Sequence, residues 1–409
     1  MATRTTKGGR GKGAKARKLI IRPDYLPFGR PNFSEREIRE VSRILASGWI
    51  GMGPQTIAFE GELAAYLGAK HVVAVNSCTS ALFLAMLLHR VGPGDEVVVP
   101  SLTWCSTANA VLYAGAKPVF CDVAADTLCA TTETVLAKVT PRTKAVIVVH
   151  YGGRAVDVRA LRAALPARVA LVEDAAHALG SRYPDGGMVG SSGNIVAFSF
   201  YANKNLSTGE GGALALADPA QADRGRSLRL HGLPNDAWKR FSQPKVSFLW
   251  TPIEELGYKM NYTDLQACMG RVQLRRQAEF NRRRLAIARH YTRELSTLEP
   301  AWGLLAGQTE PSHARHLFVV RYPAGLPLTR DAFFLELRRR NIGVSMHYTP
   351  LHMMPFYQRQ GRTSLPVAES ANDDIMTLPI SASMTLADAA YVTGHIRDIL
   401  KEPSPQRPG

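Results

Sequence analysis

Short apolar runs alternate with helical patterns between residues 71 and 200, and this alternation limits the folds open to the chain. The runs are rich in Val, Ile or Phe and have the length of strands, and the segments between them have the spacing of helices. Such alternation is typical of a mostly parallel sheet covered by helices on both faces, so we expect an α/β fold. The expected strands are 71–76, 96–100, 118–123, 145–150, 169–173 and 195–200, and the expected helices are 81–90, 106–114, 131–139 and 156–165.

The chain is expected to divide into two globular parts. With 409 residues and 45% hydrophobic content, it can bury enough apolar surface for two cores. Residues 264–295 predict one long charged helix that connects them. Beyond it we expect a strand at 316–322, helices at 330–340 and 386–400, and a loose end at 403–409. The predicted domains are a disordered basic tail at 1–22, a large sheet domain at 23–265, and the connecting helix with a small C-terminal α/β domain at 266–409.

The net charge of +16 is concentrated at the N-terminus. Residues 1–22 contain eight basic residues and no acidic one, so half of the net charge lies in this tail. Four glycines at 8–13 favour a solvated, disordered extension. Binding of such a tail to nucleic acid would be weak and salt-sensitive, so we do not expect a nucleic acid as partner.

Cysteine spacing and hydropathy indicate the compartment. The cysteines lie singly, without a C-x-x-C pair, which favours reduced thiols and argues against a zinc site. No apolar stretch approaches the roughly 18 residues of a membrane helix, and the basic N-terminus lacks an apolar signal segment. We therefore expect a cytoplasmic protein with no bound metal and no membrane partner. The cysteines are Cys78, Cys105, Cys121, Cys129 and Cys268.

A lysine and an aspartate follow two of the expected strands. Lys204 opens a polar, glycine-rich turn after 195–200, and Asp174 ends the run at 169–173. The carboxyl ends of parallel strands meet at one edge of a sheet, where ligands bind. An amine that can attach an aldehyde and a carboxylate that can pair with a ring nitrogen are what an enzyme dependent on pyridoxal 5'-phosphate (PLP) requires. We therefore predict that Lys204 and Asp174 are the catalytic residues.

Hydroxyl groups near the same edge could hold the cofactor phosphate. Thr79 and Ser80 precede the expected helix 81–90, whose first N–H groups are free to bind an anion, and Ser199 lies five residues before Lys204. The alternative for Thr79 and Ser80 is ordinary helix capping. No G-x-x-x-x-G-K-[ST] occurs, and Gly51-x-Gly53 lacks the third glycine of a dinucleotide loop. Neither ATP nor NAD is favoured.

Two further side chains could contact a pyridine ring. Trp104 follows the strand 96–100, so its indole could stack on the ring, and His177 could contact the phenolic oxygen. A core tryptophan and a structural histidine are the alternatives for these residues taken singly. Their placement on successive strand ends with Lys204 and Asp174 favours a common site.

The chain resembles the sugar aminotransferases of the DegT/DnrJ/StrS group, within fold type I of PLP-dependent enzymes. The resemblance runs from about Leu26 to Leu400 and implies a three-layer, aspartate aminotransferase-like fold in which residues 23–265 bind PLP. Its motifs are GWIGMGP at 48–54, VGPGDEV at 91–97, PRTKA at 141–145, EDAAH at 173–177, the segment around Lys204, and GYKMNYTDLQA at 257–267.

The resemblance also implies roles for single residues. Lys204 would attach the cofactor, Asp174 would pair with the pyridinium nitrogen, and Trp104 would stack on the ring. Asn261 would reach the phosphate of the neighbouring subunit, so that a homodimer is needed for complete sites. Thr79, Ser80 and Ser199 would hold the phosphate, and Tyr201, His347 and His352 would lie near the sugar.

The implied reaction transfers an amino group from L-glutamate to a nucleotide-linked 4-ketosugar. Within the group, LPFGRP at 26–31, TWCST at 103–107 and GVSMH at 343–347 are most similar to the enzymes that form UDP-4-amino-4-deoxy-L-arabinose from UDP-4-ketopentose, which predicts lipid A or lipopolysaccharide modification. Two alternatives stay open. The acceptor could be another ketosugar, such as a 4-keto-6-deoxyhexose of an O-antigen or secondary metabolite, or the protein could be a PLP-binding regulator whose basic tail binds DNA.

Overall fold

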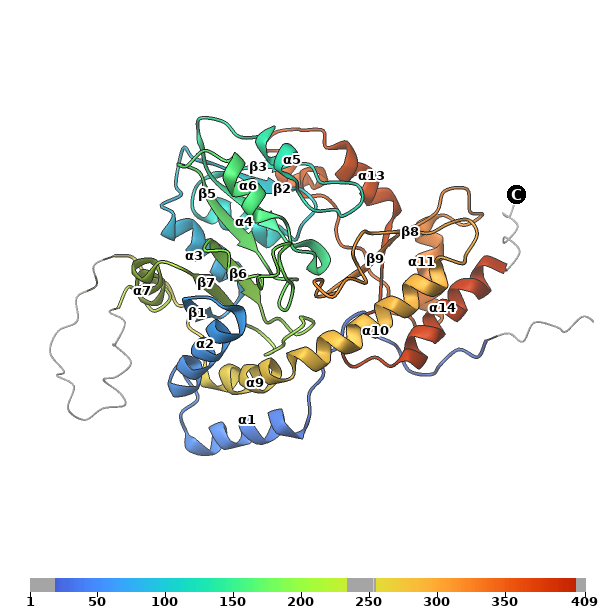
Figure 1. The fold of residues 1–409 in the computed structure, drawn as a ribbon, viewed down its shortest axis with the longest axis horizontal. Helices are drawn as coiled ribbons and strands as arrows, with labels where there is room; N and C mark the ends of the chain where they lie inside the picture. The colour runs from blue at the N-terminus through green and yellow to red at the C-terminus, as the bar shows by residue number, and fades with distance from the viewer. Residues whose placement is uncertain (1–18, 234–252, 254, 402–409) are drawn as a thin grey trace, which may run out of the picture.

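The computed structural model describes residues 19–233, 253 and 255–401 (Figure 1). The first 18 residues of the predicted basic tail and the predicted loose end at 403–409 lie outside the described residues. Arg22, the last residue of that tail, is held by an ion pair of 2.9 Å to Asp388. Among the described helices, none has both the length and the apolar character needed to cross a bilayer.

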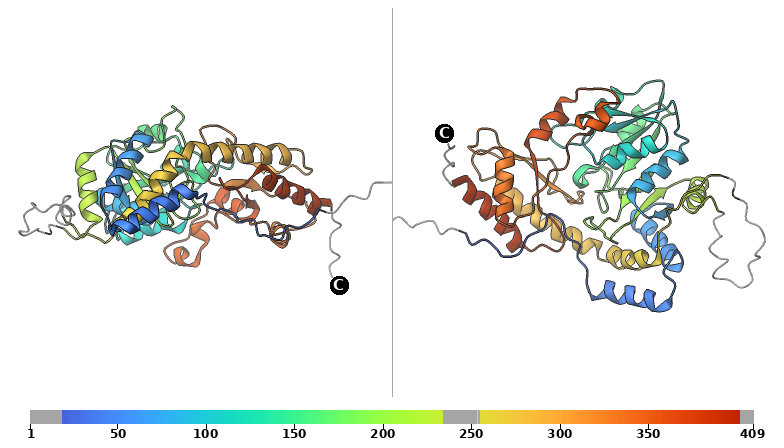
Figure 2. Two further views of the ribbon diagram at one scale, coloured as in Figure 1. Left: turned by 90° about the horizontal axis from the view of Figure 1, so that it is seen from below. Right: turned by 180° about the vertical axis from the view of Figure 1, so that it is seen from behind.

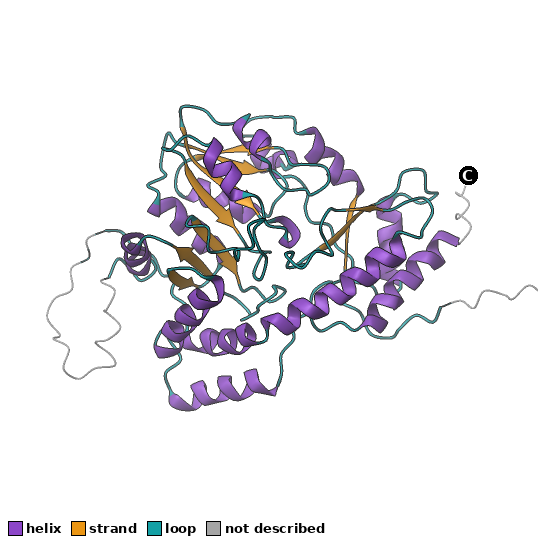
Figure 3. Ribbon diagram, viewed as in Figure 1, coloured by secondary structure: helices purple, strands orange, loops and turns teal. Residues whose placement is uncertain are grey.

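A seven-stranded sheet with the order β1-β7-β6-β5-β4-β2-β3 forms the centre of the larger part (Figure 3). Strands β2 to β6 are parallel, whereas β7 is antiparallel to both β6 and β1. The predicted α/β fold with a mostly parallel sheet is confirmed. The strands are β1 (His71–Val75), β2 (Glu96–Pro100), β3 (Lys117–Cys121), β4 (Thr143–Val149), β5 (Ala170–Asp174), β6 (Ile195–Ser199) and β7 (Gly212–Leu216).

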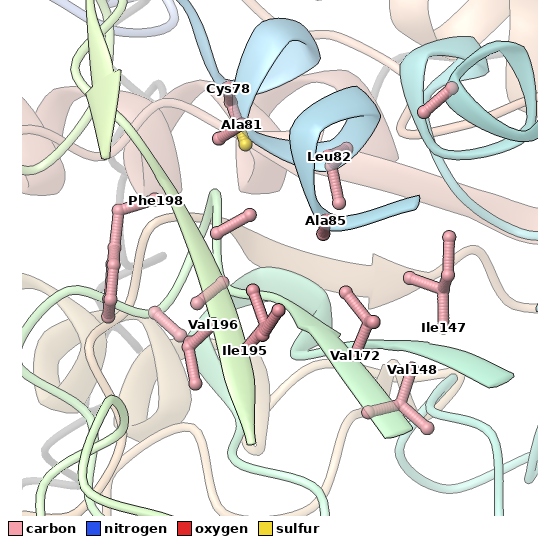
Figure 4. Packing of buried hydrophobic residues seen from close by; sticks show 14 of the residues in the cluster. Cys78, Ala81, Leu82, Ala85, Ile147, Val148, Val172, Ile195, Val196 and Phe198 are labelled. Carbon is pink, nitrogen blue, oxygen red and sulfur yellow. The ribbon is translucent and has the colours of Figure 1, made fainter. Parts of the chain in front are cut away.

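Helices cover this sheet so completely that every residue of β2, β6 and β7 is buried. Neighbouring residues of a strand point to opposite faces, so full burial means that both faces are covered. Figure 4 shows Leu82 and Ala85 of α3 facing the apolar side chains of the central strands. The helices of this part are α1 (Glu35–Ser47), α2 (Pro54–Leu67), α3 (Cys78–Leu88), α4 (Cys105–Tyr113), α5 (Thr132–Leu136), α6 (Val158–Ala164), α7 (Pro219–Leu228) and the short turn η1 (Tyr151–Gly153).

The predicted long helix 264–295 is two helices. It is interrupted at Arg276, where α9 (Asp264–Arg275) ends and α10 (Gln277–Leu295) begins. The Arg276 guanidinium bonds to Glu37 and Asn32 near the start of α1. No glycine or proline stands at this position to mark the break in the sequence. The expected strand 118–123 and helix 131–139 end earlier, at Cys121 and Leu136.

The C-terminal part has its own apolar core, formed by residues from Ile287 to Ile399 together with Leu26. Its sheet has the antiparallel order β10-β9-β8, and α10 and α14 lie side by side (Figure 2). The predicted boundary after residue 265 falls within the first turn of α9, a helix that packs against α1 and α2 of the larger part. The elements are β8 (Gly303–Leu304), β9 (Phe318–Arg321), α11 (Arg330–Arg339), η2 (Leu351–Met353), α12 (Pro355–Gln358), α13 (Pro366–Asp374), β10 (Ile375–Leu378) and α14 (Leu386–Lys401).

The buried carboxylate of Asp264 joins α9 to the start of α2. Its Oδ1 accepts hydrogen bonds of 2.9 Å from the N–H groups of Gly53 and Thr56, and its Oδ2 accepts one of 3.1 Å from the N–H of Gln55. Gly53, the residue before α2, has no side chain to cap the helix. Asp264 therefore caps α2 from more than 200 residues away in the sequence.

We expect Asp264→Ala to lower the free energy of unfolding by about 2–4 kcal/mol, because it leaves several buried N–H groups of α2 without an acceptor. Urea denaturation followed by circular dichroism measures this change. Asp331→Ala is the matched control, since the Asp331 side chain is 80% exposed, and it should cost less than about 1 kcal/mol. Equal stability of the two variants would contradict the capping role.

Candidate active site

A cavity of about 480 Å³ lies at the C-terminal ends of the central strands. Its walls come from the segments that follow β1, β2, β5 and β6, together with residues 347 and 348 of the C-terminal part. This is the edge at which ligands bind in parallel sheets. The predicted site residues that line it are Thr79, Trp104, Asp174, His177, Ser199, Tyr201, Lys204 and His347.

Asp174, the last residue of β5, presents a fixed carboxylate to the cavity. Its Oδ2 accepts a hydrogen bond of 2.8 Å from the Thr107 hydroxyl, and its Oδ1 accepts one of 3.1 Å from the N–H of Ala176. Burial raises the pKa of Asp174, while these two bonds and the nearby Lys204 act in the opposite direction. A cationic ring nitrogen at this end of the cavity would favour the ionised carboxylate further.

Lys204 lies in the turn after β6, and its amine is buried beside Asp174 and Cys78. Burial lowers the pKa of Lys204 to about 8, although Cys78 and Asp174 act to raise it. The Nζ atom lies 3.4 Å from Nε2 of His316. A lysine in this environment is neutral much more often than an exposed one, which is what an amine needs to act as a nucleophile or base.

The start of α3 forms another wall. Ser77, Cys78 and Thr79 line the cavity there, and the Thr79 hydroxyl donates a hydrogen bond of 3.0 Å to Ser106. Ser80 does not line it: its N–H donates to the hydroxyl of Ser77, which is the N-cap of α3, and its own hydroxyl donates to Asn76. Neither Thr79 nor Ser80 is the capping residue, and of the two only Thr79 faces the cavity.

Gly212 allows β7 to pass directly against this helix start. A Cβ atom at Gly212 would lie 2.5 Å from the carbonyl carbon of Ser77 and 2.6 Å from the nitrogen of Cys78. No side chain fits such a gap, because these neighbours are backbone atoms. The sequence analysis did not predict β7. Gly212 of this strand nevertheless sets how closely the sheet approaches the proposed phosphate site.

His352 lies away from the cavity, among partners that anchor its loop. Its Nδ1 lies 2.6 Å from the Ser101 hydroxyl, its Nε2 lies 3.1 Å from Glu369, and the residue is 5% exposed. The predicted contact of His352 with sugar is thus not supported by its position. The side chain instead fixes the loop that carries His347 and Tyr348.

Asn261 also lies outside this cavity. It forms an isolated bridge with Val75, at the end of β1, and is partly buried. Its expected role is in the neighbouring subunit, and that role stays a prediction.

The expected reduced cysteines fit the structure, in which Cys78, Cys105, Cys121, Cys129 and Cys268 form no disulfide.

Sequence reasoning missed several residues that line the cavity or contact its lining residues. Tyr348 lies next to the predicted His347, and its hydroxyl lies 3.1 Å from Nε2 of His177. Thr107 lies in a segment that was already noted for Trp104. Nothing in the sequence points to His316, which reaches Lys204 from the C-terminal part. Further lining residues that were not predicted include Cys78, Thr103, Ser106, Asn203 and Glu210.

These groups fit PLP. A buried amine of lowered pKa and a carboxylate face one cavity, and a helix start with hydroxyls offers a place for a phosphate. Trp104 is 58% exposed, which leaves its indole free to cover a flat ring. The buried Oδ1 of Asn203 on the cavity wall has no hydrogen-bond partner among the described residues, so it is available to a ligand. Among those residues, no group of three or more His, Cys, Asp or Glu side chains could hold a metal.

Comparisons with known proteins agree with this chemistry. Residues 31–397 match the model of the DegT/DnrJ/EryC1/StrS aminotransferase family. The spore coat polysaccharide biosynthesis protein SpsC of Bacillus subtilis is 42% identical over 390 residues, which cover 93% of this chain and 98% of SpsC.

Two solved structures extend the likeness to three dimensions. The aminotransferase TlmJ from Streptoalloteichus hindustanus has a TM-score of 0.83 at 38% identity, over 91% of this chain and 98% of TlmJ. The PLP form of the putative sugar aminotransferase Spr1654 from Streptococcus pneumoniae has a TM-score of 0.84 at 31% identity, over 92% of this chain and 99% of Spr1654. The predicted PLP cofactor and aminotransferase class are confirmed.

The covalent attachment of PLP to the apoprotein should depend on the pKa of Lys204. Only a neutral amine attacks an aldehyde, so the rate should rise with pH and level off above an apparent pKa of about 8. Stopped-flow absorbance at a series of pH values measures this rate. Nα-acetyl-lysine serves as the control and should follow the ordinary lysine pKa of 10.5. Identical profiles for protein and control would refute a lowered pKa.

Proposed function

Because the chain belongs to the DegT/DnrJ/EryC1/StrS aminotransferase family, we propose that it transfers an amino group from L-glutamate to a nucleotide-linked 4-ketosugar. The observation that carries the chemistry is that the partly buried Lys204 and the buried Asp174 face one cavity. The sugar acceptor is supported by the description of Spr1654 as a putative sugar aminotransferase and of SpsC as a polysaccharide biosynthesis protein.

When bound, PLP supplies an aldehyde that takes up amino groups and a ring that takes up electron density. Lys204 would hold it through Nζ, and Asp174 would keep its ring nitrogen protonated. Thr79 and Ser199 would bind its phosphate through their hydroxyls, and Trp104 would cover one face of the ring. These assignments are our proposal for the residues that line the cavity.

The second task of Lys204 is to move a proton. Once a substrate amine has displaced it, the free amine uses its lone pair to take a proton from the substrate carbon. The electron pair of the broken C–H bond would stay with the substrate carbon and the ring to which it is joined, and the amine of Lys204 would carry the proton. The cavity favours this role because burial keeps a large fraction of the amine neutral near pH 8.

A single subunit offers little positive charge to an anionic substrate. Among the described residues that line the cavity, Lys204 is the only lysine or arginine. The carboxylates of L-glutamate and the diphosphate of a nucleotide sugar would therefore be neutralised by groups from elsewhere. This supports the proposed homodimer, in which Asn261 would reach the cofactor phosphate of the neighbouring subunit.

The identity of the sugar is a finer proposal. UDP-4-ketopentose, and with it lipid A or lipopolysaccharide modification, rests on sequence motifs at 26–31, 103–107 and 343–347. A 4-keto-6-deoxyhexose would fit the same cofactor residues. Within the cavity, Tyr201 and His347 are the proposed sugar contacts. The cytoplasmic location stays a prediction. The alternative of a regulator with a DNA-binding tail is not favoured by the family match, and residues 1–18 of that tail lie outside the described residues.

We expect Lys204→Arg to lower kcat by about 10³- to 10⁴-fold, because a guanidinium neither attaches an aldehyde nor acts as a base near neutral pH. The reaction of the holoenzyme with L-glutamate, followed by absorbance, measures this loss. Lys117→Arg is the matched control on the exposed start of β3 and should keep full activity. Turnover by Lys204→Arg at the wild-type rate would contradict the assignment.

A panel of substrates tests the acceptor. The purified holoenzyme is incubated with L-glutamate and with UDP-4-ketopentose, UDP-4-keto-6-deoxyhexose or dTDP-4-keto-6-deoxyhexose, and products are identified by mass spectrometry. We expect an aminosugar from the ketopentose. Product from a hexose alone would reject the ketopentose but keep the reaction class. Absence of product from every ketosugar, although L-glutamate is consumed in the first half-reaction, would reject a 4-ketosugar acceptor.

A further inference from the structure

His316 lies directly beside the amine of Lys204. Its Nε2 atom is 3.4 Å from Nζ, and the residue is 3% exposed. It does not line the cavity, so Lys204 stands between this imidazole and any ligand. The His316 ring also packs on that of His177, with centroids 4.4 Å apart. A buried side chain in this position has access to the reacting amine but not to the substrate.

A rigid loop fixes His316. The preceding residue, Arg315, has a φ of 52°, and its buried guanidinium donates to the carbonyls of Gln308 and His313 and to that of Glu310. On the other side, the N–H of Leu317 donates a hydrogen bond of 3.1 Å to the carbonyl of Gly152. The imidazole is therefore held at Lys204 from both of its chain neighbours.

His177 and His316, whose rings are in contact, differ in the hydrogen bonding of their Nδ1 atoms. The N–H of Gly152 donates to Nδ1 of His177, which places the proton of that neutral ring on Nε2. Nδ1 of His316 has no hydrogen-bond partner among the described residues. No group of the described chain therefore fixes which nitrogen of His316 carries its proton, and Nε2 is free to accept a hydrogen bond from Lys204.

We propose that His316 is a positioning residue whose Nε2 accepts a hydrogen bond from the free amine of Lys204 and stabilises its protonated form. The proposal rests on the proposed aminotransferase function. When Lys204 takes a proton from the substrate carbon, its bond to His316 becomes charge-assisted and about twice as strong. His316 itself stays neutral, because burial and then the charge of Lys204 lower its pKa well below the usual value. The proton thus remains on Lys204 for return.

Substitution of His316 by phenylalanine keeps a flat ring but removes the acceptor. We expect kcat to fall about 10- to 100-fold, the KM for ketosugar to stay within about twofold, and the isotope effect with α-deuterated glutamate to rise. The apoprotein gives a separate measure. The pH profile for covalent attachment of PLP should shift to lower pH by about half to one unit, since the ammonium of Lys204 has lost its acceptor.

Two further variants separate hydrogen bonding from packing. The amide of H316Q can reach Lys204, whereas H316N is one methylene shorter, so H316Q should keep the wild-type attachment profile and H316N should follow H316F. His290→Phe, a partly buried histidine on α10, is the control and should change neither profile nor kcat. The other groups that act on Lys204 or His316, namely Cys78, Asp174, His177, Arg284 and His347, are unchanged in all these variants.

An unshifted attachment profile in H316F with wild-type thermal stability would overturn the proposal, as would identical profiles for H316Q and H316N. If H316F does not fold, the pair H316Q and H316N decides the question. Attachment to the apoprotein requires no sugar, so this result is independent of the substrate panel. Failure of the panel with a shifted profile would reject the proposed acceptor and leave the role of His316 standing.

Discussion

The burial of one amine beside one carboxylate is the constraint on which the site depends. Removing Lys204 from water disfavours its charge, and the nearby Asp174 only partly compensates. Two parallel strands that end at the same edge bring these groups together, and helices that cover both faces of the sheet keep them buried. A cavity of this kind makes a lysine reactive at ordinary pH without any change in its own chemistry.

The sequence predicts well those features that depend on local pattern. The strands β1 to β6 are apolar runs of five to seven residues, and the polar residues that follow them must lie at one edge. This reasoning was enough to place Asp174, Lys204, Trp104 and Thr79 on one cavity. The pairing of Lys204 with Asp174 already indicated PLP, and the family resemblance added the class of reaction, which periodicity could not supply.

Features that depend on tertiary contacts were not predictable in this way. The β7 run of Gly, Ala and Leu lacks the β-branched and aromatic residues that mark a strand, and it is a strand because it pairs with β1 and β6 between them in the sheet. The break at Arg276 lies where its guanidinium bonds to Glu37 and Asn32, which are more than 200 residues distant. Sequence reasoning placed His352 near the sugar and assigned no role to His316, because only the folded chain shows which histidine reaches Lys204 and which binds Ser101.

The link between Ser101, His352 and Glu369 has a consequence for the evolution of substrate choice. It attaches the loop with His347 and Tyr348 to the end of β2. The cavity wall that these two residues form is therefore held by the sheet, although the residues come from the C-terminal part. Exchanges at the rim can then alter the shape presented to a sugar while the backbone beneath them stays in place. Single side-chain replacements at the rim could then admit new sugar acceptors, while the sheet and the residues proposed to hold PLP stay unchanged.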